Sequence, residues 1–229
     1  MRTCFILLTL CFVFFRVSGQ ESEKKQFDQI KIEIYKNDFQ SQNGKKIDAK
    51  DISGTPYLDN SFQKAYILKI NGTEIKDVLL RYNAYSDNME FKKDGTNYAI
   101  AFPSEIYRLK LGDLSFIYTQ YQSATKIKHG YFQLLHEGTY CLLKKYRSVV
   151  KFPERFDSRD SIRFVKQSPT YYLKHGEGNS YEINSQKQLI KLLQPIHQPV
   201  IDYIKANNIN GKDESKLINL MEYLDDNEN

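Results

Sequence analysis

One stretch of the chain constrains its fold more than any other: residues 65–101, AYILKINGTEIKDVLLRYNAYSDNMEFKKDGTNYAIA. Two turn dipeptides, Asn71-Gly72 and Asp94-Gly95, separate runs that are rich in β-branched and aromatic residues. Asn-Gly and Asp-Gly supply the positive φ angles of a type I′ turn, whose twist matches the strands that it joins. We therefore predict a meander of four strands here, joined in the middle at residues 86–88.

The strand pattern continues on both sides of this meander. Upstream, residues 27–35 alternate between isoleucines and charged residues, which is typical of a half-buried strand. Downstream, a polar turn is expected at 123–128, a surface loop at 153–161, and an extension of the strand 139–146 at 149–152. The remaining strands are expected at 106–111, 114–121, 130–135, 139–146, 162–166, 170–174 and 181–183. Around 78–85 both faces carry apolar residues, so this strand is predicted to be covered on both sides.

After Asn184 the hydrophobic period changes to that of a helix. Ser185 is a predicted N-cap with Gln188 three residues on, which is the spacing of a capping box. Prolines predict a break near Gln194. A second helix is expected at 198–207, and a third, capped by Asp213 or Ser215, carries the apolar residues between 217 and 224.

Strands first and helices last is the layout of an α+β protein. We predict a curved, mostly antiparallel β-sheet that curls on itself or partly closes into a barrel, followed by a C-terminal cluster of short helices. Residues 20–183 form the predicted β-domain. Residues 184–229 form a helical segment that packs on it, because such short helices are not stable alone.

The first residues have the features of a secretory signal. Met1-Arg2 is positively charged, 4–15 is an apolar run, and 17–19 offers small residues for cleavage. The run is short for a membrane span, so we predict a signal peptide at 1–19, with an uncleaved anchor as the alternative and no transmembrane span after cleavage. The mature chain then keeps only Cys141, so an exported protein without internal disulfides is expected.

Composition and motifs exclude several classes of function. The formal net charge is +5, but the basic residues are interspersed with acidic ones, and a nucleic-acid-binding protein needs a concentrated basic face. The four histidines lack the spacing of metal ligands, and neither a Gly-x-Ser-x-Gly elbow nor a glycine-rich phosphate loop is present. We therefore predict no catalytic residue, no metal and no cofactor. A hydrolase that uses His136 with Glu137 or Asp87 remains an alternative.

The middle of the meander supplies the candidate residues for binding a ligand or partner: Arg81, Tyr82, Tyr85 and Asp87. A partly buried Arg81 needs an anionic partner, which Asp87 or Glu90 on the adjoining strand can supply. The chain contains 17 tyrosines, and tyrosine combines apolar area with a polar tip, which suits binding surfaces. Packing within the sheet explains an individual tyrosine equally directly.

Several blocks of sequence resemble a group of uncharacterised exported proteins of Bacteroidetes. The blocks are residues 54–58, 80–91, 130–132 and 142–145, followed by Tyr171-Tyr172 and a helical tail. The resemblance covers most of the predicted mature chain and implies a periplasmic or cell-surface protein of a Gram-negative bacterium. It implies no activity, ligand or catalytic residue. It also removes the glycosylation that Asn71-Gly72-Thr73 would otherwise indicate.

Two further hypotheses about function accompany the hydrolase alternative. The first is a non-enzymatic protein of the cell envelope, with a structural role or a role in binding another protein or a cell-surface component. The alternative is a carrier of a lipid or other apolar ligand, because a half-closed sheet covered by helices can leave an apolar cavity. Strands 114–121 and 130–135 carry enough Phe, Tyr and Leu to line one.

Overall fold

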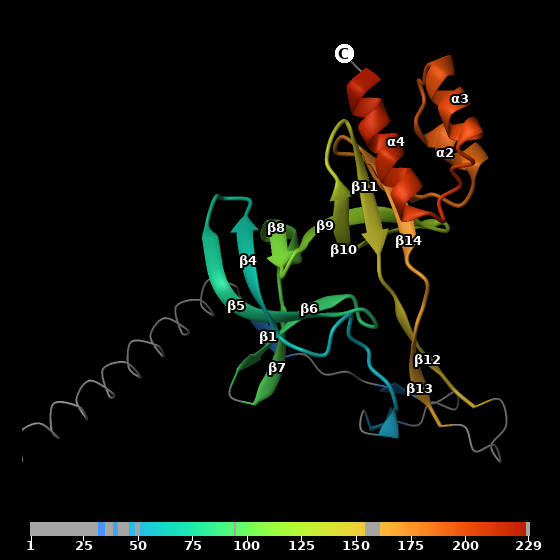
Figure 1. Ribbon diagram of the computed structural model, residues 1–229. Helices are drawn as coiled ribbons and strands as arrows, with labels where there is room; N and C mark the ends of the chain where they lie inside the picture. Colours follow the sequence, from blue (N-terminus) through green and yellow to red (C-terminus); the bar gives the residue numbers. More distant parts are fainter. Residues whose placement is uncertain are drawn as a thin grey trace, which may run out of the picture.

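The computed structural model describes residues 32–34, 39–40, 46–48, 51–93, 95–153 and 161–227. The predicted signal peptide and the first part of the predicted strand 27–35 lie outside these residues. The described chain consists of β-strands followed by three short helices, which confirms the predicted α+β fold (Figure 1).

The strands of the main sheet alternate in direction along most of the chain. They are β1 (Ile32–Ile34), β4 (Gln63–Lys69), β5 (Glu74–Asn83), β6 (Asn88–Lys93), β7 (Thr96–Ile100), β8 (Ile106–Leu111), β9 (Leu114–Ser123), β10 (Lys126–His136), β11 (Tyr140–Lys145), β14 (Thr170–His175) and β15 (Ser180–Glu182). Their order in the sheet is β1-β7-β6-β5-β4-β8-β9-β10-β11-β14-β15. Two small hairpins stand apart, β2 (Phe39–Gln40) with β3 (Lys46–Ile47), and β12 (Ser148–Lys151) with β13 (Arg163–Lys166).

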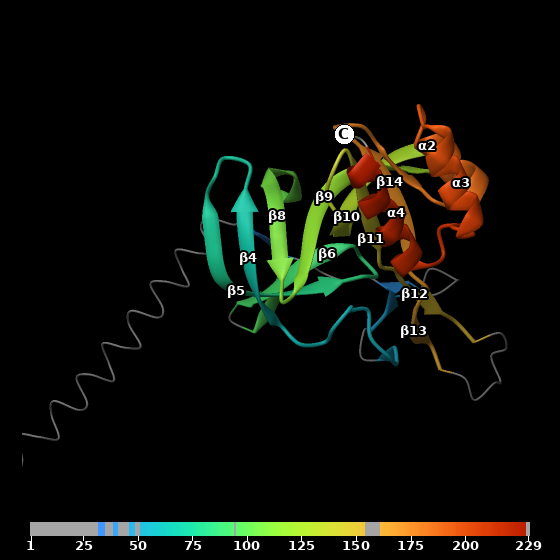
Figure 2. The same cartoon turned by 45° about the horizontal axis from the view of Figure 1, so that its top comes forward.

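The predicted meander is confirmed as β4, β5, β6 and β7, which pair with one another in sequence order. On its other side, β4 pairs with β8. The sheet then curls, so that β9, β10, β11, β14 and β15 form a partly closed five-stranded barrel (Figure 2). A single parallel pair, Ser180 with Tyr121, closes it. Strand β9 belongs to both parts of the sheet, because its first residues pair with β8 of the open sheet and Tyr121 near its end pairs with β15 of the barrel.

Three hydrophobic clusters fill the described molecule. The first lies between β4, β5, β6, β8 and β9, around fully buried Leu80, Leu109 and Phe116. The second contains Phe132 and Leu143 of the barrel, with the half-buried free thiol of Cys141 packed against it. The third joins residues of β11 and β14 to the helices. The barrel strands thus carry aromatic and aliphatic side chains on both faces, so they contribute both to the second cluster and to the third, which they share with the helices.

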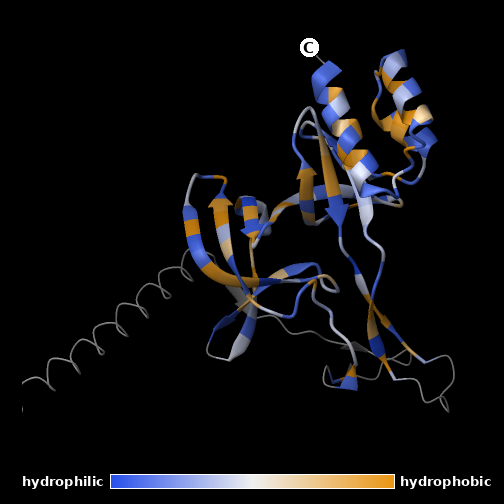
Figure 3. Cartoon of the chain, in the orientation of Figure 1, coloured by the Kyte–Doolittle hydropathy of each residue, from blue (hydrophilic) through white to orange (hydrophobic). Residues whose placement is uncertain are grey.

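The helices are α2 (Gln186–Leu192), α3 (Gln198–Ala206) and α4 (Glu214–Asn227), and polar and apolar residues are mixed along each of them (Figure 3). The predicted cap of α2 is confirmed, because the Gln188 amide donates to Ser185 Oγ at 3.2 Å. Asp213 caps α4 by accepting from the Lys216 amide at 3.1 Å. Leu217, Leu220 and Leu224 are buried in the same cluster as Leu142 and Leu173 of the barrel, so the apolar helix faces lie against the outside of the sheet.

The first hairpin turn differs from the predicted type I′ turn. Gly72 has a φ of +81°, but Asn71 does not adopt a positive φ. The Gly72 amide donates to the Lys69 carbonyl at 3.0 Å, and the Lys69 amide donates to the Thr73 carbonyl at 2.9 Å. These bonds define a three-residue loop in which only the last residue is left-handed, a loop that glycine also suits.

Two strand predictions are wrong in extent. The expected turn at 123–128 is strand except for Ala124-Thr125, because β9 and β10 pair with each other as far as Ser123 and Lys126. The expected extension of β11 at 149–152 is instead β12, which pairs with β13. At 124–128 the side chains are exposed along a two-stranded ribbon, where exposure does not prevent pairing, whereas in β12 Ser148 is buried and Val149 and Val150 are half-buried.

Strand β5 is covered on both sides only in its second half. Leu79 is 53% exposed, whereas Tyr82 and Asn83 are buried. Asp77, with a φ of 58°, interrupts the pairing of β4 with β5 before the exposed Leu79, and the part that is covered on both sides begins at Leu80. An interruption of this kind changes the twist of a strand, and here the second half continues into the interior of the sheet.

Candidate functional site

A pocket of about 540 Å³ lies where the turn between β5 and β6 approaches β9, β11 and β14. Most of its lining side chains are polar or charged, and four are tyrosines. The lining residues are Ala84, Tyr85, Asp87, Tyr121, Ser123, Ala124, Lys128, Lys145, Tyr146, Arg147, Gln167, Ser168, Thr170, Tyr172 and Glu182. This volume is within the range of sites for small molecules.

An ion pair between Asp87 and Lys145 forms part of this lining. Lys145 Nζ lies 2.5 Å from Asp87 Oδ2, and their side chains are 11% and 26% exposed. The ammonium also donates to the Tyr131 carbonyl at 2.8 Å. It lies 4.6 Å from the ring centre of Phe132 and 5.4 Å from that of Tyr121. Charge, hydrogen bonding and aromatic faces therefore all hold the ammonium in place.

The other oxygen of Asp87 is engaged as well. Asp87 Oδ1 accepts from the hydroxyl of Tyr82 at 2.7 Å and from the backbone amide of Tyr131 at 3.2 Å. Asp87 itself has a φ of 58°, a left-handed conformation that side chains other than Asn and Asp rarely adopt. One carboxylate therefore connects the β5–β6 turn to both β10 and β11.

Gly130 makes room for this arrangement. A Cβ atom at this position of β10 would overlap Asp87 Oδ2 and would lie 2.5 Å from Lys145 Nζ. Gly130 has no positive φ, so the requirement for glycine here comes from the close approach of the ion pair.

Burial sets the protonation behaviour of the site. It lowers the pKa of Lys145; the charge and hydrogen bond of Asp87 oppose this shift, whereas Arg147 adds to it. Burial, followed by the charge of Asp87, raises the pKa values of Tyr82 and Tyr131 well above the ordinary tyrosine value. Burial also raises the pKa of Tyr172 to about 12, with the charge of Glu182 as the next cause. The tyrosine hydroxyls therefore remain protonated and able to donate at neutral pH.

An aromatic cluster adjoins the ion pair. Tyr121, Phe132 and Tyr172 pack edge to face, with ring centres 5.0 to 5.7 Å apart. Phe132 is fully buried, whereas Tyr121 is half-buried and lines the pocket together with Tyr172. Edge-to-face packing of this kind gives the wall a fixed shape.

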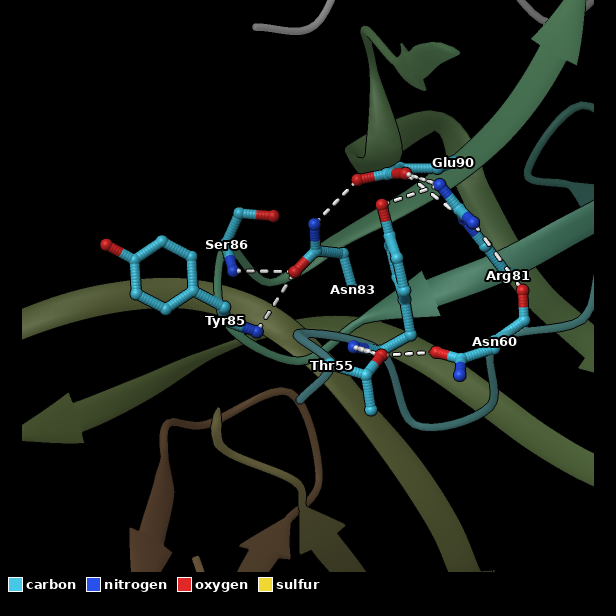
Figure 4. A network of polar contacts seen from close by, with 8 residues as sticks. Thr55, Asn60, Arg81, Asn83, Tyr85, Ser86 and Glu90 are labelled. Carbon is cyan, nitrogen blue, oxygen red and sulfur yellow. Dashed lines mark hydrogen bonds and ion pairs between the residues drawn. The ribbon is translucent and has the colours of Figure 1, made fainter. Parts of the chain in front are cut away.

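The polar network around Arg81 supports the turn that carries Asp87 (Figure 4). Arg81 Nη2 lies 3.1 Å from Glu90 Oε2, and Asn83 Nδ2 donates to Glu90 Oε1 at 2.6 Å. Asn83 Oδ1 in turn accepts from the backbone amides of Tyr85 and Ser86, both at 3.1 Å. Glu90 and Asn83 are fully buried, so the network fixes the start of the turn from inside the sheet.

Aromatic rings complete the surroundings of Arg81. Its guanidinium carbon lies 3.6 Å from the ring centre of Tyr57 and 4.5 Å from that of Phe62. Burial, followed by the charge of Glu90, raises the pKa of Tyr57 to about 12. Of the two carboxylates suggested for Arg81 from the sequence, Glu90 is its partner, while Asp87 pairs with Lys145.

The four residues nominated from the sequence thus have different positions. Tyr85 and Asp87 line the pocket, and Tyr82 is buried behind it, bonded to Asp87. Arg81 does not line this pocket and belongs to the supporting network. The sequence suggested a solvated strand face for the basic cluster of Lys144, Lys145 and Arg147; this is wrong for Lys145, whose side chain is 11% exposed and paired with Asp87.

The groups named in the hydrolase hypothesis are engaged by different partners. His136 Nε2 lies 3.0 Å from Asp225 Oδ2 of α4, and Glu137 Oε1 lies 2.5 Å from Arg108 Nη2. Asp87 belongs to the pocket described above. The three groups therefore do not converge on one another through any contact in the described chain.

Within the described part of the chain, no group of three or more His, Cys, Asp or Glu side chains is arranged to hold a metal ion. None of the helices found there is long and apolar enough to cross a membrane. Comparisons of this chain with protein-family models, with curated proteins and with solved structures give no match.

Proposed function

We propose that this chain is an exported, non-enzymatic binding protein that holds a small polar ligand in the pocket beside Asp87 and Lys145. The observation that carries the proposal is the combination of a pocket of about 540 Å³ with a buried ion pair in its wall. The export part rests on the signal-like segment at residues 1–19.

The ion pair supports binding because its two members are already satisfied. A nucleophilic lysine must be free to attack, but Lys145 Nζ is held 2.5 Å from Asp87 Oδ2 and donates to the Tyr131 carbonyl at 2.8 Å, although burial lowers its pKa. A carboxylate base must accept a proton, but both oxygens of Asp87 are occupied by donors. Such a pair fixes the shape and the charge distribution of the pocket wall, and neither group is free to act as a nucleophile or a base.

The lining of the pocket favours a polar ligand over the lipid carried in the alternative hypothesis. The barrel cluster is filled by Phe132, Leu143 and Tyr172, which are all buried. The charged residues of the pocket would lose hydration against an acyl chain without gaining a partner.

The proposal can be tested by following backbone amides in an NMR titration of the protein. The probes are D-galactose, D-galacturonate, L-arginine, L-glutamate and dodecanoate. We expect at least one of the four polar probes to shift the amides of residues 84–87 and 145–147. The variant Ser168→Trp, which fills the pocket, should abolish these shifts, and Lys212→Trp on an exposed loop should retain them. Binding of dodecanoate alone, or of none of the five, would refute the proposal.

A further inference from the structure

The charges of the pocket do not cancel, and this imbalance identifies the class of ligand. Three cationic side chains line it, Lys128, Lys145 and Arg147, against two carboxylates, Asp87 and Glu182. Lys145 is paired with Asp87. Within the described chain, the exposed side chains of Lys128 and Arg147 make no ion pair or hydrogen bond.

The field of Arg147 reaches the groups of the pocket wall. Its charge acts on Lys145 and on the hydroxyl of Tyr121. Arg147 is exposed and lines the same pocket as Tyr121 and Tyr172 of the aromatic cluster. A planar guanidinium binds the two oxygens of a carboxylate with two parallel hydrogen bonds, so Arg147 is well suited to an anionic group.

The uncharged part of the lining is rich in hydroxyl groups. Its hydroxyl-bearing residues are Tyr85, Tyr121, Ser123, Tyr146, Ser168, Thr170 and Tyr172. A hydroxyl both donates and accepts, so a wall of hydroxyls suits a ligand whose own groups also do both. The hydroxyls of Tyr146 and Tyr172 already donate, to Gln133 Oε1 at 2.6 Å and to Glu182 Oε2 at 3.4 Å, so these two offer acceptors to a ligand. Tyrosine rings add apolar area against which the C–H face of a sugar ring can pack.

Resting on the proposed function, we infer that the ligand is an acidic sugar, either free or as a unit of an acidic oligosaccharide. Arg147 and Lys128, which both line the pocket, bind the carboxylate, and the hydroxyl-bearing side chains bind the ring hydroxyls. The Asp87–Lys145 pair stays intact and keeps the wall in shape. No bond of the sugar is broken, since the site only binds it.

D-galacturonate and D-galactose form a matched pair of probes, because they differ only in a carboxylate that replaces a CH₂OH group. We expect isothermal titration calorimetry to show binding of galacturonate at least about tenfold tighter than that of galactose, the usual effect of one charge-assisted hydrogen-bonded pair. The preference should shrink as salt is added, because the cations that bind the carboxylate are exposed. Trigalacturonate as a third probe distinguishes an oligosaccharide from the free sugar by tighter binding.

The matched protein variants are Arg147→Gln and Arg163→Gln, the second on the exposed face of β13 and outside the pocket lining. Arg147→Gln should remove most of the preference for galacturonate over galactose, measured as the ratio of the two dissociation constants, while Arg163→Gln should leave this ratio unchanged. Equal binding of the two sugars, unaffected by Arg147→Gln, would overturn the inference and leave the proposed function standing. Binding of only a non-sugar probe would also overturn it. Failure of every probe at the pocket would refute the proposed function itself.

Discussion

The substitution Asp87→Asn tests how much the buried Asp87–Lys145 ion pair contributes to the free energy of unfolding. Asparagine tolerates the left-handed φ of 58° at this position, so the backbone of the turn is preserved. Its side-chain oxygen can still accept from the Tyr82 hydroxyl and the Tyr131 amide, which now bond to Asp87 Oδ1. The loss is therefore confined to the contact with Lys145, where the negative charge and the acceptor of the Lys145 hydrogen bond both disappear, because an amide nitrogen only donates.

The expected loss of stability depends on the interactions that Lys145 keeps in this variant. Breaking a buried ion pair by removing one member typically costs about 3–5 kcal/mol, since the other charge stays buried without compensation. The ammonium keeps its bond to the Tyr131 carbonyl and its position over the Phe132 ring, and its side chain is 11% exposed at the pocket. We therefore expect the lower end, a loss of about 3 kcal/mol, which for a chain of this size lowers Tm by about 6–12 °C.

The control is Asp77→Asn in the same protein. Asp77 also has a φ of 58°, but its ion pair with Lys64, at 3.4 Å, is exposed on both sides, at 77% and 72%. An exposed pair contributes about 0–1 kcal/mol, so this variant should retain nearly the full free energy of unfolding in a urea titration. If the two variants lose the same amount, the Asp87–Lys145 pair has no special role in stability.

The pH dependence of stability provides a second test of the same variant. Burial lowers the pKa of Lys145 in the folded protein, and Asp87→Asn removes the charge that opposes this shift. The unfolded chain then binds more protons at this lysine than the folded chain, so stability rises with pH. The deficit of Asp87→Asn relative to the unmodified protein should therefore shrink as pH rises towards the ordinary lysine pKa of about 10.4. A deficit that is constant with pH would refute the reasoning.

Two further predictions concern the same part of the fold. Gly130→Ala should lower the free energy of unfolding by about 2–3 kcal/mol, because its Cβ displaces the buried pair. In a double-mutant cycle its loss should not add to that of Asp87→Asn, and full additivity would contradict the shared cause. Stability should also fall as pH rises from about 10 to about 12, since tyrosines ionise in the unfolded chain before Tyr57 and Tyr172 do in the folded one, where their pKa values are about 12. Ultraviolet absorbance of tyrosinate, compared with Tyr57→Phe and Tyr172→Phe, measures this; titration of both tyrosines at the ordinary pKa would contradict it.

Local patterns in the sequence were sufficient for the elements and their order. Turn dipeptides and runs of β-branched residues marked β4 to β7, and the change of period after Asn184 marked the helices. The Ser185 cap followed from the spacing to Gln188. One error arose where pairing depends on a strand further along the chain, at β12, whose partner β13 begins twelve residues after β12 ends. Local strand propensity does not indicate which strand further along the chain will be the partner.

The sequence by itself therefore determined a curved antiparallel sheet followed by short helices, because turns, hydrophobic periods and caps act over a few residues. It also nominated Tyr85 and Asp87, two residues that line the pocket. Only the tertiary structure decided what Asp87 does, because Tyr131 and Lys145 lie 44 and 58 residues further along the chain. The curl of the sheet brings β10 and β11 against the β5–β6 turn, and a contact between such distant segments leaves no periodic trace in the sequence.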